Sequence, residues 1–285
     1  MKILFITDSA SDLQPEQVEG KPITIVPARI NVDGREFCDF YDISAQEYWE
    51  MLKTTESVPH TSMAAPHEYL SAYKTARKKG YTHICVTQIS STASGTMNSA
   101  VIAKDLLHNE GVTDINIDII DTQNYSMAYG HAVLEGVKMA EEGSAFEKIT
   151  ARIRGICKKS EIVFSVFTLK YLRKCGRVSG IAAFAGEMLG LRPILKAGRG
   201  QIPVVGRARG EKHVLEGIVG AIKKSRNSAE RFMGIVHADV PKELICRLED
   251  LLEEHFGLKN LPKFIMGSAV TTNAGPHVIG VLYYA

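Results

Sequence analysis

Residues 82–107 decide the fold of this chain; they read THICVTQISSTASGTMNSAVIAKDLL. Residues 82–89 are rich in β-branched and apolar side chains, which predicts a strand buried on both faces of a parallel sheet. Residues 97–107 place apolar side chains at helical spacing and contain neither Gly nor Pro. Residues 90–96 are therefore expected to form a strand-to-helix turn at the carboxyl end of a strand, where open α/β sheets form their ligand crevice.

This turn carries hydroxyl groups on Ser90, Ser91, Ser94 and Thr96, and Gly95 allows close approach to its backbone. The start of the helix adds unpaired N–H groups and the positive end of the helix dipole. Such neutral donors suit a carboxylate or a phosphate oxygen. Taken alone, the pattern is explained more simply by Ser94 capping the helix while the other hydroxyls bind turn backbone.

Length and composition limit the class of protein. With 285 residues the chain has room for two domains, and the pattern of elements changes near residue 160. We expect an N-terminal α/β domain at 1–159 and a C-terminal α+β domain at 160–285, joined by a short crossover. The net charge is only +2 and no basic stripe is present, so nucleic acid is not an expected partner.

The cysteines favour a reducing compartment. Cys38, Cys85, Cys157, Cys175 and Cys246 are odd in number, far apart and without a C-x-x-C pair, so neither disulfides nor a zinc site is expected. No apolar run approaches the roughly 20 residues that span a bilayer, and the N-terminal apolar run is too short for the core of a signal peptide. A cytoplasmic protein without a membrane span is expected.

Strand and helix patterns alternate in the first half and mix in the second. Other strands are expected at 2–6, 23–32, 115–121, 162–167, 232–237, 264–270 and 278–284, with a hairpin at 194–197 and 201–205. Other helices are expected at 44–53, 67–79, 125–142, 145–159, 169–175, 181–189, 211–225 and 241–256. The segment 181–189 is apolar nearly all round, which indicates a buried helix that could equally line an apolar pocket.

Two further polar turns are candidate sites. Asp8 and Asp12 follow the first strand, and Asp8 could bind a metal or accept a phosphoryl group. Their spacing lacks a close second carboxylate, which favours turn and capping roles. Thr61 and Ser62 lie in a Pro-bounded loop before a helix start, where they could bind a ligand or cap the helix.

Recognisable catalytic motifs are missing. The chain contains no Walker A, G-x-G-x-x-G, G-x-S-x-G or H-E-x-x-H pattern. No histidine and carboxylate form an acid–base pair in sequence. The pattern is more typical of a binding protein than of a catalyst.

Five short motifs together resemble one known family. They are Thr7-Asp8-Ser9 with Asp12-Leu13, Thr61-Ser62, Ser90-Ser91 with Ser94-Gly95-Thr96, Gly176-Arg177 with Ser179, and Gly275-Pro276. Their order and spacing are similar to those of the DegV family, bacterial fatty-acid-binding proteins that serve as the lipid-carrying subunit of fatty acid kinase. The resemblance covers almost the whole chain.

The resemblance implies a parallel-sheet domain followed by a domain with a largely antiparallel sheet. It also implies one long-chain fatty acid as ligand, without another cofactor, its carboxylate held by Thr61 and Ser94 with Ser62 and Ser91 close by. Arg177 and Arg209 match arginines near the mouth, where a fatty acid kinase subunit would dock and phosphorylate the carboxylate. The chain would then be a carrier without catalytic activity of its own.

The last motif departs from the family pattern. Asn273 stands where the family usually has a histidine, and His277 stands at a glycine position. Asn273 can still donate a hydrogen bond to the ligand but cannot become cationic. Met63 and Ala64 replace the usual Gln-Pro after Thr61-Ser62. The alternatives to a lipid carrier are a metal-dependent phosphotransferase or phosphatase that uses Asp8, and a DNA-binding regulator, which the dispersed charge disfavours.

Overall fold

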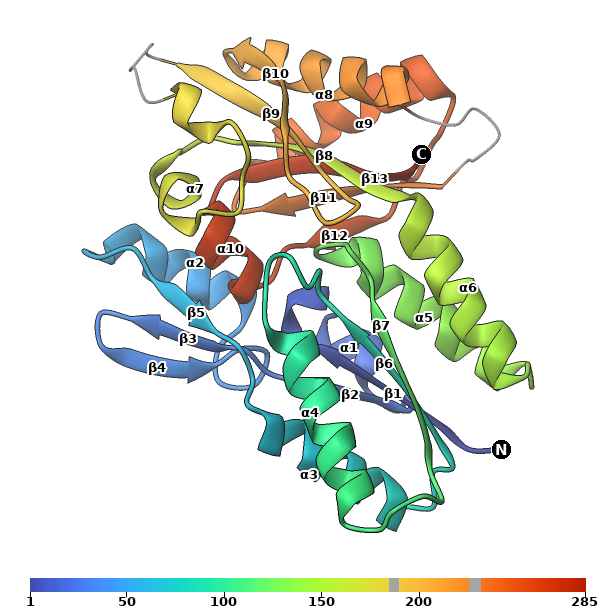
Figure 1. Cartoon of the computed structure of the whole chain (residues 1–285). Helices are drawn as coiled ribbons and strands as arrows, with labels where there is room; N and C mark the ends of the chain where they lie inside the picture. Colours follow the sequence, from blue (N-terminus) through green and yellow to red (C-terminus); the bar gives the residue numbers. More distant parts are fainter. Residues whose placement is uncertain (185–189, 226–231) are drawn as a thin grey trace.

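The parallel sheet expected in the first half is present in the computed structural model, which describes residues 1–184, 190–225 and 232–285 (Figure 1). Its four strands pair in the order β2-β1-β6-β7, all parallel. They are β1 (Ile3–Asp8), β2 (Ile23–Val26), β6 (His83–Gln88) and β7 (Asn116–Asp121). Since β1 and β6 are parallel neighbours in this sheet, the turns that follow them lie side by side.

Alternating side chains bury both faces of this sheet, as a parallel sheet requires. Ile3, Phe5 and Cys85 pack on one face against α5 (Met127–Glu141) and α6 (Phe146–Lys159). Ile84 and Val86 pack on the other face against α3 (Pro66–Lys78) and α4 (Thr96–Asn109). The buried strand and the following helix that residues 82–107 predict are confirmed.

A small antiparallel sheet extends the first half, in the order β4-β3-β5. Its strands are β3 (Arg29–Val32), β4 (Arg35–Cys38) and β5 (His60–Ser62). The expected strand 23–32 is divided at Pro27-Ala28, where β2 ends and the chain enters β3. Asp33 and Gly34 both have positive φ and join β3 to β4 in a two-residue hairpin, a turn signal that the sequence reasoning missed.

The second half contains a six-stranded sheet in the order β10-β9-β8-β13-β11-β12. All its pairs are antiparallel except β11 with β12. The strands are β8 (Ser160–Val166), β9 (Leu191–Ala197), β10 (Val204–Arg209), β11 (Met233–Ala238), β12 (Lys263–Ile265) and β13 (Val278–Tyr284). The expected α/β fold class, with a parallel and a largely antiparallel sheet, is therefore correct.

The two faces of this sheet belong to different cores. Val163 and Val281 point outward under α8 (Glu211–Ser225) and α9 (Lys242–Phe256), which cover the top of the molecule in Figure 1. Ile162, Phe164 and Leu282 point inward and join the core that also contains α5 and α6. One apolar core therefore runs from the first half into the second. The two halves are also joined directly, because β8 follows α6 without a linker.

One expected strand is partly wrong. Residues 264–270 were expected to be extended, but β12 ends at Ile265 and helix α10 (Ser268–Ala274) begins after Gly267. The backbone N–H of Gly267 donates to Asp12 Oδ1 at 2.9 Å, across 255 residues of sequence. This tertiary contact satisfies the helix start, and a local pattern of apolar residues cannot reveal it.

Helices α2 (Ala45–Thr54) and α7 (Lys170–Cys175) lie close to their expected positions, whereas the short helices at 9–11 and 15–18 were not predicted. Ser44 and Glu47 form the capping box of α2. In the segment 181–189, residues 181–184 form a short 3₁₀ helix and 185–189 lie outside the described residues. These elements are η1 (Ser9–Ser11), α1 (Pro15–Val18), α2 (Ala45–Thr54), α7 (Lys170–Cys175) and η2 (Ile181–Phe184).

Candidate functional site

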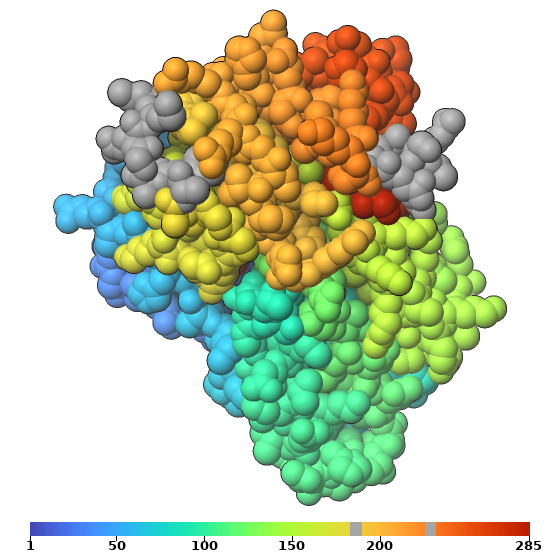
Figure 2. All heavy atoms as spheres, turned by 45° about the horizontal axis from the view of Figure 1, so that its top comes forward, coloured from blue at the N-terminus to red at the C-terminus, as the bar shows by residue number. Residues whose placement is uncertain are grey.

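A cavity lies where the carboxyl edge of the parallel sheet meets the inner face of the second sheet. Its volume is about 300 Å³, at the lower end of the roughly 300–1,000 Å³ typical of small-molecule sites. Segments from all parts of the chain line it: β5 and the turn after β6 from the first half, and β8, α7 and α10 from the second. Figure 2 shows the yellow and orange segments of the second half lying directly against the teal and green ones of the first.

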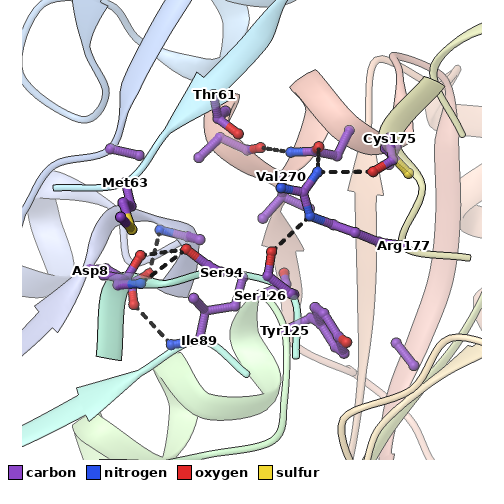
Figure 3. Close-up of a pocket in the computed structure, with 18 of the residues that line it drawn as sticks. Asp8, Thr61, Met63, Ile89, Ser94, Tyr125, Ser126, Cys175, Arg177 and Val270 are labelled. Atoms are coloured by element: carbon purple, nitrogen blue, oxygen red, sulfur yellow. Dashed lines mark hydrogen bonds between the residues drawn. The ribbon is translucent and has the colours of Figure 1, made fainter. Parts of the chain in front are cut away.

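Hydroxyl groups from two separate segments reach one end of this cavity. Thr61 and Ser62 on β5 line it, and so does Ser94 in the turn before α4 (Figure 3). Among the residues that the structure describes, the Thr61 hydroxyl has no hydrogen-bond partner. It is therefore available to a ligand. The loop expected at 58–66 contains a short strand, because Thr61 pairs with Ile30 of β3.

Local contacts fix residues 90–95, the turn before α4 that we call the serine turn. The N-terminal cap residue of α4 is Gly95 and not Ser94, so no side chain caps the start of this helix. Ser94 Oγ lies 2.5 Å from Thr96 Oγ1 and accepts from Thr96 N at 3.3 Å. A Cβ at position 95 would lie 2.5 Å from Met63 Sδ, so glycine allows the β5 segment to approach this turn. Met63 also lines the cavity and was not predicted as a site residue.

Apolar side chains surround the rest of the cavity. They come mainly from the inner face of the second sheet and from the segment 266–274, and residues near 172–178 and 202 complete them. The group consists of Ile162, Phe164, Leu172, Val178, Ala197, Ile202, Met266, Ala269, Val270 and Ala274. The hydroxyl groups of the lining thus come from the first half of the chain, and the second half supplies mainly apolar side chains.

Asp8 is a charged residue in the cavity lining, and it is 3% exposed. Its Oδ1 accepts from Ala10 N at 3.0 Å and Tyr129 OH at 2.6 Å, and its Oδ2 accepts from Ile89 N at 2.8 Å. Burial raises the pKa of Asp8 to about 6, and these hydrogen bonds oppose that rise. Asp8 caps η1, in line with the capping role that its spacing favours.

Two other buried carboxyl groups hold α10 against the first half. Asp12 accepts from Gly267 N and from the Ser126 hydroxyl. Asp39 accepts from Ala269 N near the start of the same helix, and burial raises the pKa of Asp39 to about 6. Burial also raises the pKa of Asp12 well above its usual range. The helix that lines the cavity is therefore positioned by carboxyl groups from the other half of the chain.

Arg177 follows α7 and also lines the cavity, pointing toward the serine turn in Figure 3. Its Nε donates to Ala93 O at 2.8 Å, and its Nη1 donates to Cys175 O at 3.2 Å and to Asn273 Oδ1 at 2.6 Å. Asn273 lies near the end of α10 and lines the cavity as well. The structure thus brings Thr61, Ser94 and these two side chains to one site.

Other candidate residues lie outside this lining. The Ser91 hydroxyl donates to Asp121 Oδ2 at 2.6 Å at the carboxyl end of β7, and Ser91 is not part of the lining. Arg209 ends β10 and is not a lining residue. His277 has positive φ, and its Nδ1 is hydrogen-bonded to Asp239 O, away from the cavity. The family resemblance implies that Ser91 lies close to the ligand's carboxylate, and this stays a prediction.

A comparison with protein families covers nearly the whole chain. The model described as "Uncharacterised protein, DegV family" matches residues 2–285. The chain belongs to the DegV family. A DegV domain-containing protein of Caldanaerobacter subterraneus is 30% identical over 290 residues, covering 99% of this chain and 98% of the relative. Another from Clostridium perfringens is 32% identical over 257 residues, covering 89% and 90%.

Solved structures of other DegV proteins share the fold throughout. A DegV family protein from Thermus thermophilus, described with fatty acid binding, superposes with a TM-score of 0.86 at 27% identity and covers 100% of both chains. A stearic-acid-binding protein from Eubacterium ventriosum has a TM-score of 0.86 at 25% identity, covering 100% of this chain and 98% of that one. The expected family membership is confirmed.

Within 1–184, 190–225 and 232–285, no three or more His, Cys, Asp or Glu side chains gather as metal ligands. In the same ranges, no helix is both long and apolar enough to cross a bilayer.

The apolar lining from 162–178 and 266–274 had no sequence signal of its own, because core side chains and pocket side chains share one pattern.

Proposed function

We propose that this DegV protein binds one long-chain fatty acid in the cavity between its two sheets. The polar end with Thr61, Ser62 and Ser94 would receive the carboxylate, and the apolar end would receive the acyl chain. The observation that carries this proposal is a single cavity lined both by hydroxyl groups, of which that of Thr61 has no partner among the described residues, and by a large group of apolar side chains. The fatty acids named for relatives of the same fold support it.

The two ends of the cavity would contribute differently to binding. Each buried methylene group is worth on the order of 0.8 kcal/mol, so a chain of about sixteen carbons supplies most of the affinity. Neutral hydroxyl donors contribute less, because they exchange one hydrogen bond with water for another. The hydroxyl groups therefore orient the ligand and fix which end of it lies at the serine turn.

We further propose that the bound fatty acid is presented to a separate kinase, which converts its carboxylate to an acyl phosphate. The carboxylate end of the cavity lies near Arg177, and Arg209 lies on the same half of the chain, so both arginines could contact an acidic partner. The chain would act as a carrier without catalytic activity of its own. Asp8, the candidate for phosphoryl transfer, has both carboxylate oxygens engaged as acceptors.

The lipid content of the purified protein tests the binding proposal. Extraction with organic solvent and mass spectrometry should yield about one long-chain fatty acid for each protein chain. Added palmitate or oleate should stabilise lipid-free protein by about 2.7 kcal/mol at a hundredfold excess over the dissociation constant. If no fatty acid co-purifies and added fatty acid gives no thermal stabilisation, the proposal is contradicted.

The kinase step needs its own assay. Protein loaded with radiolabelled fatty acid should yield acyl phosphate only when a fatty acid kinase subunit and ATP are both added. Metal-dependent turnover of a phosphate ester by the protein alone, lost in Asp8→Asn, would instead support the phosphotransferase alternative.

A further inference from the structure

The cavity meets the solvent beside its hydroxyl groups. The exposed residues of its described lining are Ser62, Met63, Gly95 and Arg177, whereas the lining residues on β8 and β9 are buried. Exposed lining residues mark the place where a cavity opens. These four residues, from the end of β5, the serine turn and the segment after α7, therefore form the mouth of the cavity.

Met63 is the one long apolar side chain among the exposed residues of the described lining. It is 52% exposed, while the next residue, Ala64, is buried. Because Met63 also lines the cavity, its side chain lies between the cavity and the solvent. Figure 3 shows Met63 on the side of the cavity where Asp8 and Ser94 lie. A lipid head group placed at Ser94 would therefore have Met63 as its neighbour at the mouth.

The sulfur atom of Met63 is held by packing against Gly95. A Cβ at position 95 would lie 2.5 Å from Met63 Sδ and 3.3 Å from Met63 Cε, so the glycine leaves free the space that the thioether fills. Within the described ranges, the Met63 side chain takes part in no hydrogen bond. A methionine side chain is unbranched and rotates about three bonds. The mouth is therefore narrowed by a side chain that only packing keeps in place.

A narrowed mouth treats head groups of different size differently. A free carboxylate is one of the smallest head groups of a lipid, whereas a glycerol ester is larger and carries two hydroxyl groups. A glycerol group at the mouth would either displace Met63 or place its hydroxyls against a thioether, which is only a weak hydrogen-bond acceptor. Forcing extra atoms into a packed site and leaving buried hydroxyls unpaired both cost free energy. The side chain at position 63 thus acts against large polar head groups.

We propose that Met63 limits the size of the lipid head group, so that the cavity admits a free carboxylate and disfavours a glycerol ester. This inference rests on the proposed binding of a fatty acid. It assigns to Met63 a part in specificity that needs no hydrogen bond to the ligand. Gly95 supplies the space in which the sulfur atom lies.

Two neutral esters with the same acyl chain isolate the size of the head group. Dissociation constants are measured for methyl palmitate and for 1-monopalmitoylglycerol, with palmitate as the reference for the proposed function. The unmodified protein should bind the glycerol ester more weakly than the methyl ester. Met63→Ala should reduce this difference about tenfold by tightening the binding of the glycerol ester, because the mouth becomes wider.

Two further variants control for the loss of a methionine. Met63→Leu should retain the difference between the esters, because leucine is apolar and of similar volume. Met97→Ala should also retain it, because Met97 is half-buried in the first turn of α4 and lies outside the described lining. A loss of the difference in either variant as large as in Met63→Ala would overturn the inference.

Thermal unfolding of the lipid-free protein tests the contact between Met63 and Gly95. Gly95 has a φ of −77°, which alanine can adopt, so Gly95→Ala should lower Tm mainly because the new Cβ meets the sulfur atom. The loss should be smaller in the Met63→Ala background, where the sulfur atom is absent. Gly155→Ala is the control, because a Cβ there meets nothing within 4 Å, and its effect should be equal in both backgrounds. Equal losses from Gly95→Ala in both backgrounds would contradict the inference.

The outcomes separate this inference from the proposed function. If the unmodified protein binds none of the three lipids, the proposed function fails and the limit on the head group fails with it. If the protein binds palmitate but binds the two esters equally well, only the role of Met63 fails. The role of Met63 also fails if Met63→Ala leaves the difference between the esters unchanged.

Discussion

The carboxyl edge of the first sheet and the inner face of the second meet at one cavity, yet they differ in chemistry. The first sheet contributes Ser94 and the Asp8 carboxyl group, each set in a network of hydrogen bonds. The second sheet contributes apolar side chains such as Phe164 and Ala197. The reason is geometric. A strand's end exposes turn backbone and polar caps, whereas a sheet face exposes alternate side chains that must be apolar to pack.

Because the two sheets differ in this way, we expect the affinity and the orientation of a ligand to depend on different sheets. Apolar burial is proportional to the area removed from water and has no preferred direction. Hydrogen bonds are directional and nearly balanced by those lost to water. We therefore expect changes in the second sheet to alter affinity most, and changes at the serine turn to alter head-group recognition.

The largest effect is expected when the apolar end is filled. Ala197 is 4% exposed on the inner side of β9 and lines the cavity. Ala197→Phe should weaken palmitate binding at least about 100-fold, because the ring takes the space of several methylene groups. Val205→Phe is the control, since Val205 is 43% exposed on the partner strand β10. Isothermal titration measures both, and unchanged affinity in Ala197→Phe would place the acyl chain elsewhere.

A smaller effect is expected at the polar end. Thr61→Ala combined with Ser94→Ala should weaken palmitate binding about 10- to 100-fold, since each of the two hydrogen bonds contributes a net of about 0.5–1.5 kcal/mol. Ser91→Ala should have little effect, because its hydroxyl is bound to Asp121. Thermal unfolding verifies that each variant is folded. A loss in Ser91→Ala as large as in the double variant would contradict the assignment of the head-group end.

The buried carboxyl groups predict a pH dependence of stability. Asp8 and Asp39 have pKa values of about 6 in the folded protein against a usual value of 3.8, so the folded state binds their protons more tightly. Their contribution is complete below about pH 4 and is lost as the pH rises to 6 and beyond. Each is worth on the order of 1–3 kcal/mol.

Denaturant unfolding between pH 7 and pH 5 measures this effect. The free energy of unfolding should rise as the pH is lowered from 7 to 5. Below about pH 4 the trend should reverse, because Asp33 and Asp114 have lowered pKa values through bonds to Ser57 and Arg77. Asp39→Asn should reduce the change between pH 7 and pH 5. A flat profile in the unmodified protein would show that these carboxyl groups are not the source.

The smallest effect concerns the contact between the two halves. Thr92 Oγ1 donates to Gly200 O at 2.5 Å, where the β9–β10 hairpin meets the serine turn. Thr92→Val should lower the free energy of unfolding by about 1 kcal/mol, the usual net value of one hydrogen bond. Thr54→Val is the control, because the Thr54 hydroxyl binds Met51 O within its own helix. An equal change in both variants would mean that the hairpin contact adds nothing to the interface.

Much of the fold follows from local patterns. The buried strand at 82–89, the helix after it and the helix at 44–53 were all predicted, because period and capping chemistry act over a few residues. The strand expected at 264–270 was partly wrong, since the start of α10 depends on Asp12. The hairpin at Asp33-Gly34 was missed, although its two residues are a recognised turn signal.

The candidate site was predicted less completely. Thr61, Ser62, Ser94 and Asn273 line one cavity, whereas Ser91 binds Asp121 instead. The apolar lining was not predicted, because a side chain that faces a cavity has the same sequence signature as one that faces the core. The packing of Met63 against Gly95 also depends on two segments that sequence alone does not bring together.

By itself, the sequence determined the order of strands and helices, the polar turns at the strand ends, and the kinship with the DegV family. Only the tertiary structure decided which hydroxyl groups share a cavity, which carboxyl groups are buried, and that Asn273 holds Arg177. The physical reason is the separation in sequence between the residues that interact. Backbone period and capping are set by residues a few positions apart, whereas a cavity and its charge balance arise from side chains more than a hundred residues apart.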